Sequence, residues 1–343
     1  MRVRRDHLSI VLNALFDRGD SRFSIVHPSI ELGELATVSL AGHDSSTVRF
    51  TTQLQAYQDA RDEIINTYPE QVGNDIPRLD QYLKAALASG VIQIKNYDEV
   101  KQLLDRYGNP NLMAGHPPVF AGFDTNLLSW RIDRILGLRD LNKGVGYVNG
   151  FVLATGVRDE LSWDYKCHNT DPFVDAFGEV YSEYWNQPVG DARIGRLGQL
   201  AYRSIRDIDQ ADEIECDRGD ENIVAAYDAY NRDRRCQILL FSNDRNFVER
   251  ARSHTILSQH IAFPDELPRQ KTVTWKQIEL LIYMYAVIFG VIELPGMSVH
   301  SVWRGKDDLD WQYERVKLNC RSPTLKKQIE RDLSIVESYD DIT

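Results

Sequence analysis

The stretch Ile238-Leu239-Leu240-Phe241-Ser242-Asn243-Asp244-Arg245-Asn246-Phe247 decides the fold. Four apolar residues stop abruptly at Ser242, Asn243 and Asp244, which is the pattern of a buried strand followed at once by a carboxylate. A second stretch repeats it, because Val119-Phe120-Ala121-Gly122-Phe123 leads into Asp124-Thr125-Asn126. Open α/β folds bind ligands at the carboxyl ends of their strands. Two strand-end aspartates therefore suggest a shared metal site.

Strand and helix patterns alternate around these two stretches, over residues 117–263. Alternation of this kind indicates a parallel sheet covered by helices on both faces. Strands are expected at 119–123, within 146–157, and at 214–216, 237–242 and 255–262. Helices are expected at 127–136, 172–186, 191–207, 221–231 and 247–253.

The residues before this region predict a mainly helical N-terminal domain, 1–116. Apolar side chains recur at helical spacing over 8–16, 53–68, 77–88 and 97–107. Strands or turns at 23–26 and 36–40 and a short strand at 91–94 interrupt the helices. The breakers Asn109-Pro110-Asn111 and Gly115-His116-Pro117-Pro118 end the domain.

Residues 264–343 predict a small α+β C-terminal extension. It begins with the apolar helix 275–289 and continues with a hairpin of 298–304 and 311–318. Ser322-Pro323 caps a last helix. The region 117–263 is thus expected to be a domain of its own between two flanking parts.

Composition describes an ordinary globular chain. Its 343 residues suggest two or three domains. No apolar run reaches the roughly 18 to 20 residues that cross a bilayer, and the basic N-terminal residues lack the apolar block of a signal peptide. We therefore expect a cytoplasmic protein without a membrane partner. The cysteines Cys167, Cys216, Cys236 and Cys320 are too widely spaced for a zinc site.

The net charge of −11 argues against non-specific nucleic-acid binding, which needs a basic surface. Cations bound at a carboxylate-rich site would reverse the local sign. Tyr181, Tyr184 and Trp185 recur at helical spacing and predict core packing rather than a platform for stacked bases.

Four acidic residues stand where a strand ends or a helix begins: Asp124, Glu160, Asp220 and Asp244. Asp217 and Glu221 are alternatives to Asp220. Clustered carboxylates supply the oxygen ligands that Mg²⁺ or Mn²⁺ needs, and such an ion can activate water against a phosphodiester. Taken singly, each acid could instead cap a helix or complement its dipole.

The order of these blocks resembles PIN-domain nucleases over about 117–263. The resemblance is carried by Phe123-Asp124-Thr125-Asn126, Val157-Arg158-Asp159-Glu160-Leu161, Gly219-Asp220-Glu221-Asn222 and Leu240-Phe241-Ser242-Asn243-Asp244-Arg245-Asn246. The last block is close to the threonine-asparagine-aspartate-arginine-asparagine signature of one branch, with Ser242 where threonine often stands. The excess over 165–210 predicts extra helices over the site.

This resemblance implies a three-layer α/β/α fold and metal-dependent hydrolysis of RNA, less often of structured DNA. Asp124, Glu160, Asp220 and Asp244 would hold Mg²⁺ or Mn²⁺, with Asp217 or Glu221 as alternates for Asp220. Thr125, Ser242 and Asn243 would orient water or substrate oxygens. The expected activity is that of an endoribonuclease, with the N-terminal domain choosing the substrate, a protein partner or a second copy of the chain.

Two other functions fit parts of the pattern. A PIN-like scaffold whose site has lapsed would keep the fold and bind without cutting. A phosphatase on a related doubly wound fold would need a nucleophilic Asp-x-Asp, and Asp124-Thr125-Asn126 lacks the second aspartate. Retention of all four acids at these places speaks against the lapsed scaffold. The most useful observation is whether the four carboxylates converge within metal-sharing distance.

Overall fold

The computed structural model of the protein describes residues 1–42, 44–140, 145–161, 169–186, 188, 190, 192–303 and 314–340. The chain divides into two compact units, which are interleaved along the sequence. Unit 1 comprises Met1–Ile92, Asp164–Arg193 and Glu266–Thr343, and unit 2 comprises Gln93–Trp163 and Ile194–Asp265.

Unit 2 is built on a five-stranded parallel sheet in the order β11-β10-β5-β8-β9. Its strands are β5 (Val119–Phe123), β8 (Gly150–Ala154), β9 (Asp212–Ile214), β10 (Gln237–Ser242) and β11 (Leu257–His260). The strand order reverses between β5 and β10. Doubly wound sheets bind their ligands at such a reversal. The expected α/β class with a parallel sheet is confirmed.

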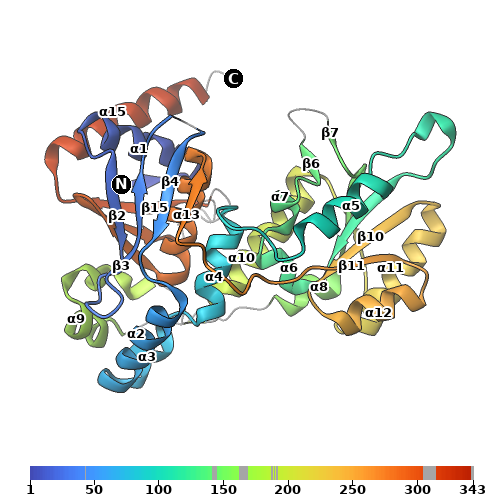
Figure 1. Ribbon diagram of the computed structural model, residues 1–343, viewed down its shortest axis with the longest axis horizontal. Helices are drawn as coiled ribbons and strands as arrows, with labels where there is room; N and C mark the ends of the chain where they lie inside the picture. The colour runs from blue at the N-terminus through green and yellow to red at the C-terminus, as the bar shows by residue number, and fades with distance from the viewer. Residues whose placement is uncertain are drawn as a thin grey trace. The chain divides into compact units, whose positions relative to one another are not determined.

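Helices precede and connect the strands of this sheet (Figure 1). They are α5 (Tyr97–Tyr107), η2 (Leu112–Ala114), α6 (Thr125–Ser129), α7 (Ile132–Ile135), α8 (Thr155–Glu160), α10 (Ala192–Arg203), η4 (Ser204–Ile208), α11 (Asp220–Arg234) and α12 (Arg245–Ser253). The two-stranded ribbon of β6 (Arg139–Asp140) and β7 (Val145–Gly146) accompanies them.

Helix α11 lies directly on the sheet through Tyr227. A Cβ atom added at Gly122 would stand 2.7 Å from Cε1 of Tyr227, so only glycine allows this approach. The buried Tyr227 hydroxyl lies 3.3 Å from the carbonyl oxygens of Phe123 and Val152. The middle of α11 is therefore held against the end of β5 and the middle of β8.

Unit 1 contains an eight-stranded antiparallel sheet in the order β1-β15-β14-β13-β2-β3-β4-β12. The strands are β1 (Arg2–Val3), β2 (Arg22–Val26), β3 (Glu34–Ser39), β4 (Ser46–Phe50), β12 (Gln270–Val273), β13 (Val291–Leu294), β14 (Met297–Ser301) and β15 (Val316–Cys320). N-terminal and C-terminal strands pair directly, as Glu293 with Val26 and Gln270 with Arg49.

The helices of unit 1 include α13 (Trp275–Phe289), which is buried along most of its length. The others are η1 (Arg5–His7), α1 (Leu8–Asp17), α2 (Leu54–Thr67), α3 (Glu70–Asp75), α4 (Leu79–Ala88), α9 (Asp171–Phe177), η3 (Glu179–Asn186) and α15 (Pro323–Asp340). Tyr82 stacks on Tyr57 at 4.3 Å between ring centroids and lies 5.7 Å from the ring of Tyr285.

The three consecutive domains expected from the sequence, 1–116, 117–263 and 264–343, need correction. The first 92 residues and the last 78 share one sheet and one unit, so the C-terminal part is no separate extension. Helices outnumber strands in the N-terminal part, as expected, but this part also supplies β1 to β4 to the shared sheet. Residues 93–116, including α5, belong with unit 2. The predicted and observed divisions differ because strands far apart in the sequence pair with one another, and local sequence patterns do not predict such pairing.

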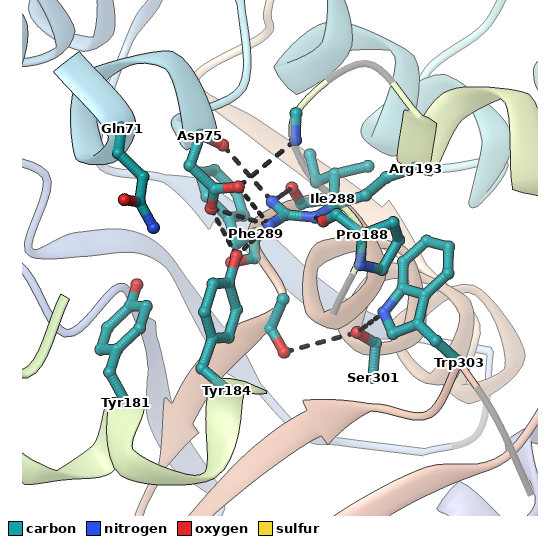
Figure 2. A network of polar contacts seen from close by, with 12 residues as sticks. Gln71, Asp75, Tyr181, Tyr184, Pro188, Arg193, Ile288, Phe289, Ser301 and Trp303 are labelled. Carbon is teal, nitrogen blue, oxygen red and sulfur yellow. Dashed lines mark hydrogen bonds and ion pairs between the residues drawn. The ribbon is translucent and has the colours of Figure 1, made fainter. Parts of the chain in front are cut away.

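The extra helices expected at 165–210 are divided between the units: α9 and η3 belong to unit 1, whereas most of α10 and all of η4 belong to unit 2. Residues 164–193 belong to unit 1, where Tyr181 and Tyr184 are buried in the core, as predicted for their spacing. Figure 2 shows the polar network that holds this segment. The side chain of Arg193 donates to both carboxylate oxygens of Asp75 at 2.7 Å and to the carbonyl of Ile288 at 2.8 Å.

The predicted C-terminal hairpin is present as β14 paired with β15. Its connecting residues 304–313, with Lys306 near the expected tip, lie outside the described residues. Within the described part of the chain, no helix is both long enough and apolar enough to cross a membrane.

Candidate functional site

The predicted acidic residues follow strands that end at one edge of the unit 2 sheet. Asp124 follows β5, and Asp244 follows β10 by two residues. Glu160 closes α8, which starts directly after β8, and Asp220 begins α11 after β9. Because these strands are parallel neighbours, their carboxyl ends share this edge, at the reversal of strand order.

Ser242 joins the two strand-end aspartates. Its buried hydroxyl donates to Oδ2 of Asp124 at 2.8 Å and accepts from the backbone N–H of Asp244 at 2.9 Å. The other oxygen of Asp124 accepts from the N–H of Thr125 at 2.7 Å. Asp124 is thus held between two neighbouring strand ends.

Both aspartates also cap helices, the structural role that such residues often have. Asp124 is the N-cap of α6, and Asp244 caps α12 by accepting from the N–H of Asn246 at 2.7 Å. The capping interactions use one oxygen of each carboxylate. Asp244 is exposed, and its capping hydrogen bond uses only Oδ1. Its Oδ2 can therefore bind a further ligand.

Glu160 holds the segment before α11 at the same edge of the sheet through hydrogen bonds. One of its oxygens accepts from the N–H of Gly219 at 3.0 Å, and the other accepts from the hydroxyl of Thr125. Gly219 is the N-cap of α11 and has a φ of 101°, which favours glycine. Glu160 therefore connects the start of α6 with the start of α11.

The charges of these acids act on one another. Burial raises the pKa of Asp124 to about 6, and the charges of Asp220 and Glu160 add to the rise against the hydrogen bonds from Ser242 and Thr125. Burial also raises the pKa of Asp220, opposed by the charge of Arg250 and reinforced by Asp244 and Glu160. All four predicted acids are thus electrostatic neighbours. The alternates Asp217 and Glu221 are exposed.

The acidic edge offers oxygen donors of the kind that a hard divalent cation needs. Carboxylate oxygens are suitable ligands, and the buried Oδ1 of Asn243 has no hydrogen-bond partner among the described residues. Their chemistry fits Mg²⁺ or Mn²⁺. Within the described ranges, however, no group of three or more His, Cys, Asp or Glu residues is arranged to hold a metal ion. Side-chain movement would be needed for joint ligation.

Two residues at this edge escape the sequence reasoning. His260 ends β11, pairs in register with Ser242, and has Nε2 3.1 Å from the carbonyl oxygen of Asn243. Arg250 lies on α12, and its positive charge lowers the pKa of Asp220, against the rise that burial causes. The strand-end rule could have identified His260, because its strand belongs to the same sheet. Arg250 has no sequence signal of its own.

A second polar constellation, the Asp75–Arg193 network of unit 1, does not form a site. The Arg193 side chain is fully buried, and its Nε donates to the carbonyl of Pro188 at 3.1 Å (Figure 2). Tyr184 donates to Asp75. Protein groups satisfy this charge pair, so its role is structural.

No protein-family model matches the chain, and no curated protein sequence matches it.

Proposed function

We propose that unit 2 is a PIN-like three-layer α/β/α domain that hydrolyses phosphodiester bonds in RNA with the help of Mg²⁺ or Mn²⁺. The observation that carries this proposal is the linked pair of Asp124 and Asp244 at the reversal of strand order, joined by Ser242. A raised pKa at Asp124, with burial as its main cause, supports it further, because functional sites concentrate such perturbations.

In this proposal the carboxylates of Asp124, Glu160, Asp220 and Asp244 hold the cation. A bound divalent ion would supply an activated water and neutralise charge on the phosphodiester. Thr125 and Ser242 orient the carboxylates through the hydrogen bonds of their hydroxyl groups. Asn243 offers its Oδ1, which has no hydrogen-bond partner among the residues that the structure describes, to water or to a substrate hydroxyl.

The test is cleavage of an end-labelled single-stranded RNA by purified protein. Mn²⁺ or Mg²⁺ should support cleavage, EDTA should stop it, and Asp244→Asn should abolish it, because a neutral amide is a poor ligand for a hard cation. Asp265→Asn is the matched control, since its carboxyl is exposed and pairs with Lys95. Cleavage undiminished in Asp244→Asn would refute the proposal.

A lapsed binding scaffold on the same fold is the second candidate. It is favoured by the hydrogen bonds that already occupy both oxygens of Asp124 and of Glu160. Such a scaffold predicts no cleavage and no rise in melting temperature with millimolar Mn²⁺. An enzyme that binds the ion in its native state alone gains about 2.7 kcal/mol at a hundredfold excess over Kd.

A further inference from the structure

Asn96 holds the end of β11 from outside the five-stranded sheet. It is the N-cap residue of α5, a position at which asparagine commonly binds the first N–H groups of its helix, but its side chain makes no capping hydrogen bond. Its Nδ2 instead donates to the carbonyl of His260 at 2.8 Å, and its Oδ1 accepts from the N–H of Ala262 at 2.8 Å. The Asn96 amide thus binds two backbone groups, as the backbone of a further strand would.

Backbone hydrogen bonds fix the same segment on both of its sides. On one side, the N–H of Lys95 donates to the carbonyl of Ala262 at 3.0 Å. On the other side, the N–H of Ile261 donates to the carbonyl of Ser242 at 2.8 Å. The segment at the end of β11 therefore lies between β10 and the residues before α5. The base of the His260 side chain thus has a defined position relative to the end of β10.

The imidazole of His260 connects this fixed segment with the acidic edge. Its Nε2 lies 3.1 Å from the carbonyl oxygen of Asn243. Because a carbonyl oxygen only accepts, Nε2 must carry the proton and donate it. Asn243 stands between Ser242, which joins the two aspartates, and Asp244 itself. The hydrogen bond from His260 therefore holds the backbone of the turn that carries Asp244.

This turn has few other contacts of its own. Asn243 and Asp244 lie between the end of β10 and the start of α12, so neither belongs to a strand or a helix. The Oδ1 of Asn243 is buried and has no hydrogen-bond partner among the described residues. A buried acceptor without a partner costs free energy, so the turn would rotate it toward water unless other contacts held the backbone.

We propose that Asn96 and His260 are positioning residues for the acidic edge. Asn96 fixes His260, and His260 holds the carbonyl of Asn243, so that Asp244 and the Oδ1 of Asn243 stay directed at a bound divalent cation and its water. This inference rests on the proposed function and deepens it, because it assigns the residues that control the geometry of that site. Outer residues that orient the groups around a metal commonly change its affinity or the activity by about 10- to 100-fold.

Two substitutions of His260 separate the hydrogen-bond donor from the shape of the ring. His260→Phe keeps a ring without an N–H, whereas His260→Gln places an amide N–H near the position of Nε2. In the RNA cleavage assay with Mn²⁺, His260→Phe should lower kcat about tenfold or more with little change in KM, because the turn acts on the cation rather than on RNA binding. His260→Gln should restore most of the activity, and Asn96→Ala should lower kcat in the same sense.

His254→Phe is the matched control, because Nδ1 of His254 lies 3.4 Å from Asp228 and makes no contact with Asn243. It should leave kcat unchanged. An equal loss in His254→Phe and His260→Phe, or a His260→Gln variant as impaired as His260→Phe, would overturn the proposal. Asn96→Ala, which changes a residue outside the sheet, decides the matter if His260→Phe does not fold.

Hydrogen exchange measured by NMR tests the support without any activity. The N–H of Asp244 is bonded to the Ser242 hydroxyl. It should lose protection in His260→Phe and in Asn96→Ala and keep it in His260→Gln, while the amides of β5 stay protected in all three. Unchanged protection of Asp244 would refute the positioning role even if RNA is cut. Loss of protection in a protein that cuts no RNA would refute the proposed function alone.

Discussion

At the scale of single residues, Asp124 is held in an environment that disfavours its charge. Its side chain is buried, and burial raises its pKa from 3.8 to about 6. Between these values the native state binds a proton that the unfolded state has already released. The free energy of unfolding therefore falls as pH rises through this window, by up to about 3 kcal/mol. The folded protein thus keeps an ionised group at neutral pH at the expense of its own stability.

Asp124→Asn should remove this dependence, because the amide does not ionise. We expect the variant to be more stable than the wild type at pH 7 and to lose most of that advantage at pH 4. Urea unfolding across pH 4 to 7 measures the difference. A difference that does not change with pH would show that Asp124 ionises without cost.

At the scale of elements, the Ser242 hydroxyl joins the end of β5 to the start of α12. It donates to Asp124 and accepts from the N–H of Asp244, so one side chain satisfies groups on two elements. An unsatisfied buried polar group costs about 1 to 3 kcal/mol. The alignment of the two aspartates therefore depends on a single hydroxyl.

Ser242→Ala should lower the free energy of unfolding by about 1 to 3 kcal/mol at pH 7. The loss should be smaller at pH 4.5, where Asp124 is largely protonated and needs the donor less. Ser242→Thr, which keeps the hydroxyl, is the control and should retain most of the stability. If alanine were tolerated as well as threonine in urea melts, the hydroxyl would not be needed to align the site.

At the scale of the whole molecule, the Asp75–Arg193 pair secures residues 164–193 in unit 1. The pair joins α3 to a segment that the chain reaches only after leaving unit 2. Arg193→Met should destabilise unit 1 by about 3 to 5 kcal/mol, because Asp75 would remain as an uncompensated buried charge. Loss of hydrogen-exchange protection in α3 and η3 would report it.

The double variant Asp75→Asn/Arg193→Met should recover part of this loss, since no charge is left unpaired. Arg232→Met, which breaks an exposed pair, should change stability by no more than about 1 kcal/mol. Equal effects of the buried and the exposed substitution would mean that the Asp75 pair does not hold the segment.

At the scale of the whole molecule, the sequence predicts some strands and site residues and misses others. Continuous apolar runs identify β5 and β10, and the strand-end rule then identifies Asp124 and Asp244 as neighbours. The eight-stranded sheet escapes prediction because its decisive pairing, Val26 with Glu293, joins residues that no local periodicity relates. The edge strand β12 is short and mostly exposed, so its sequence lacks an apolar alternation. The position of Asp220 depends on Gly219 and Glu160, a contact that only the fold reveals.

The interleaving of the units matters while the chain is being synthesised. β2 leaves the ribosome early, but its neighbour β13 follows only after all of unit 2. Translation at roughly 5 to 20 residues per second separates the two strands by about 10 to 50 seconds. Throughout that interval β2 presents an unpaired edge, a known starting point for aggregation, and unit 2 receives its last residue, Asp265, before β13 is synthesised. The nascent chain thus contains all of unit 2, with its carboxylates, before the eight-stranded sheet that includes the N-terminal strands can be completed.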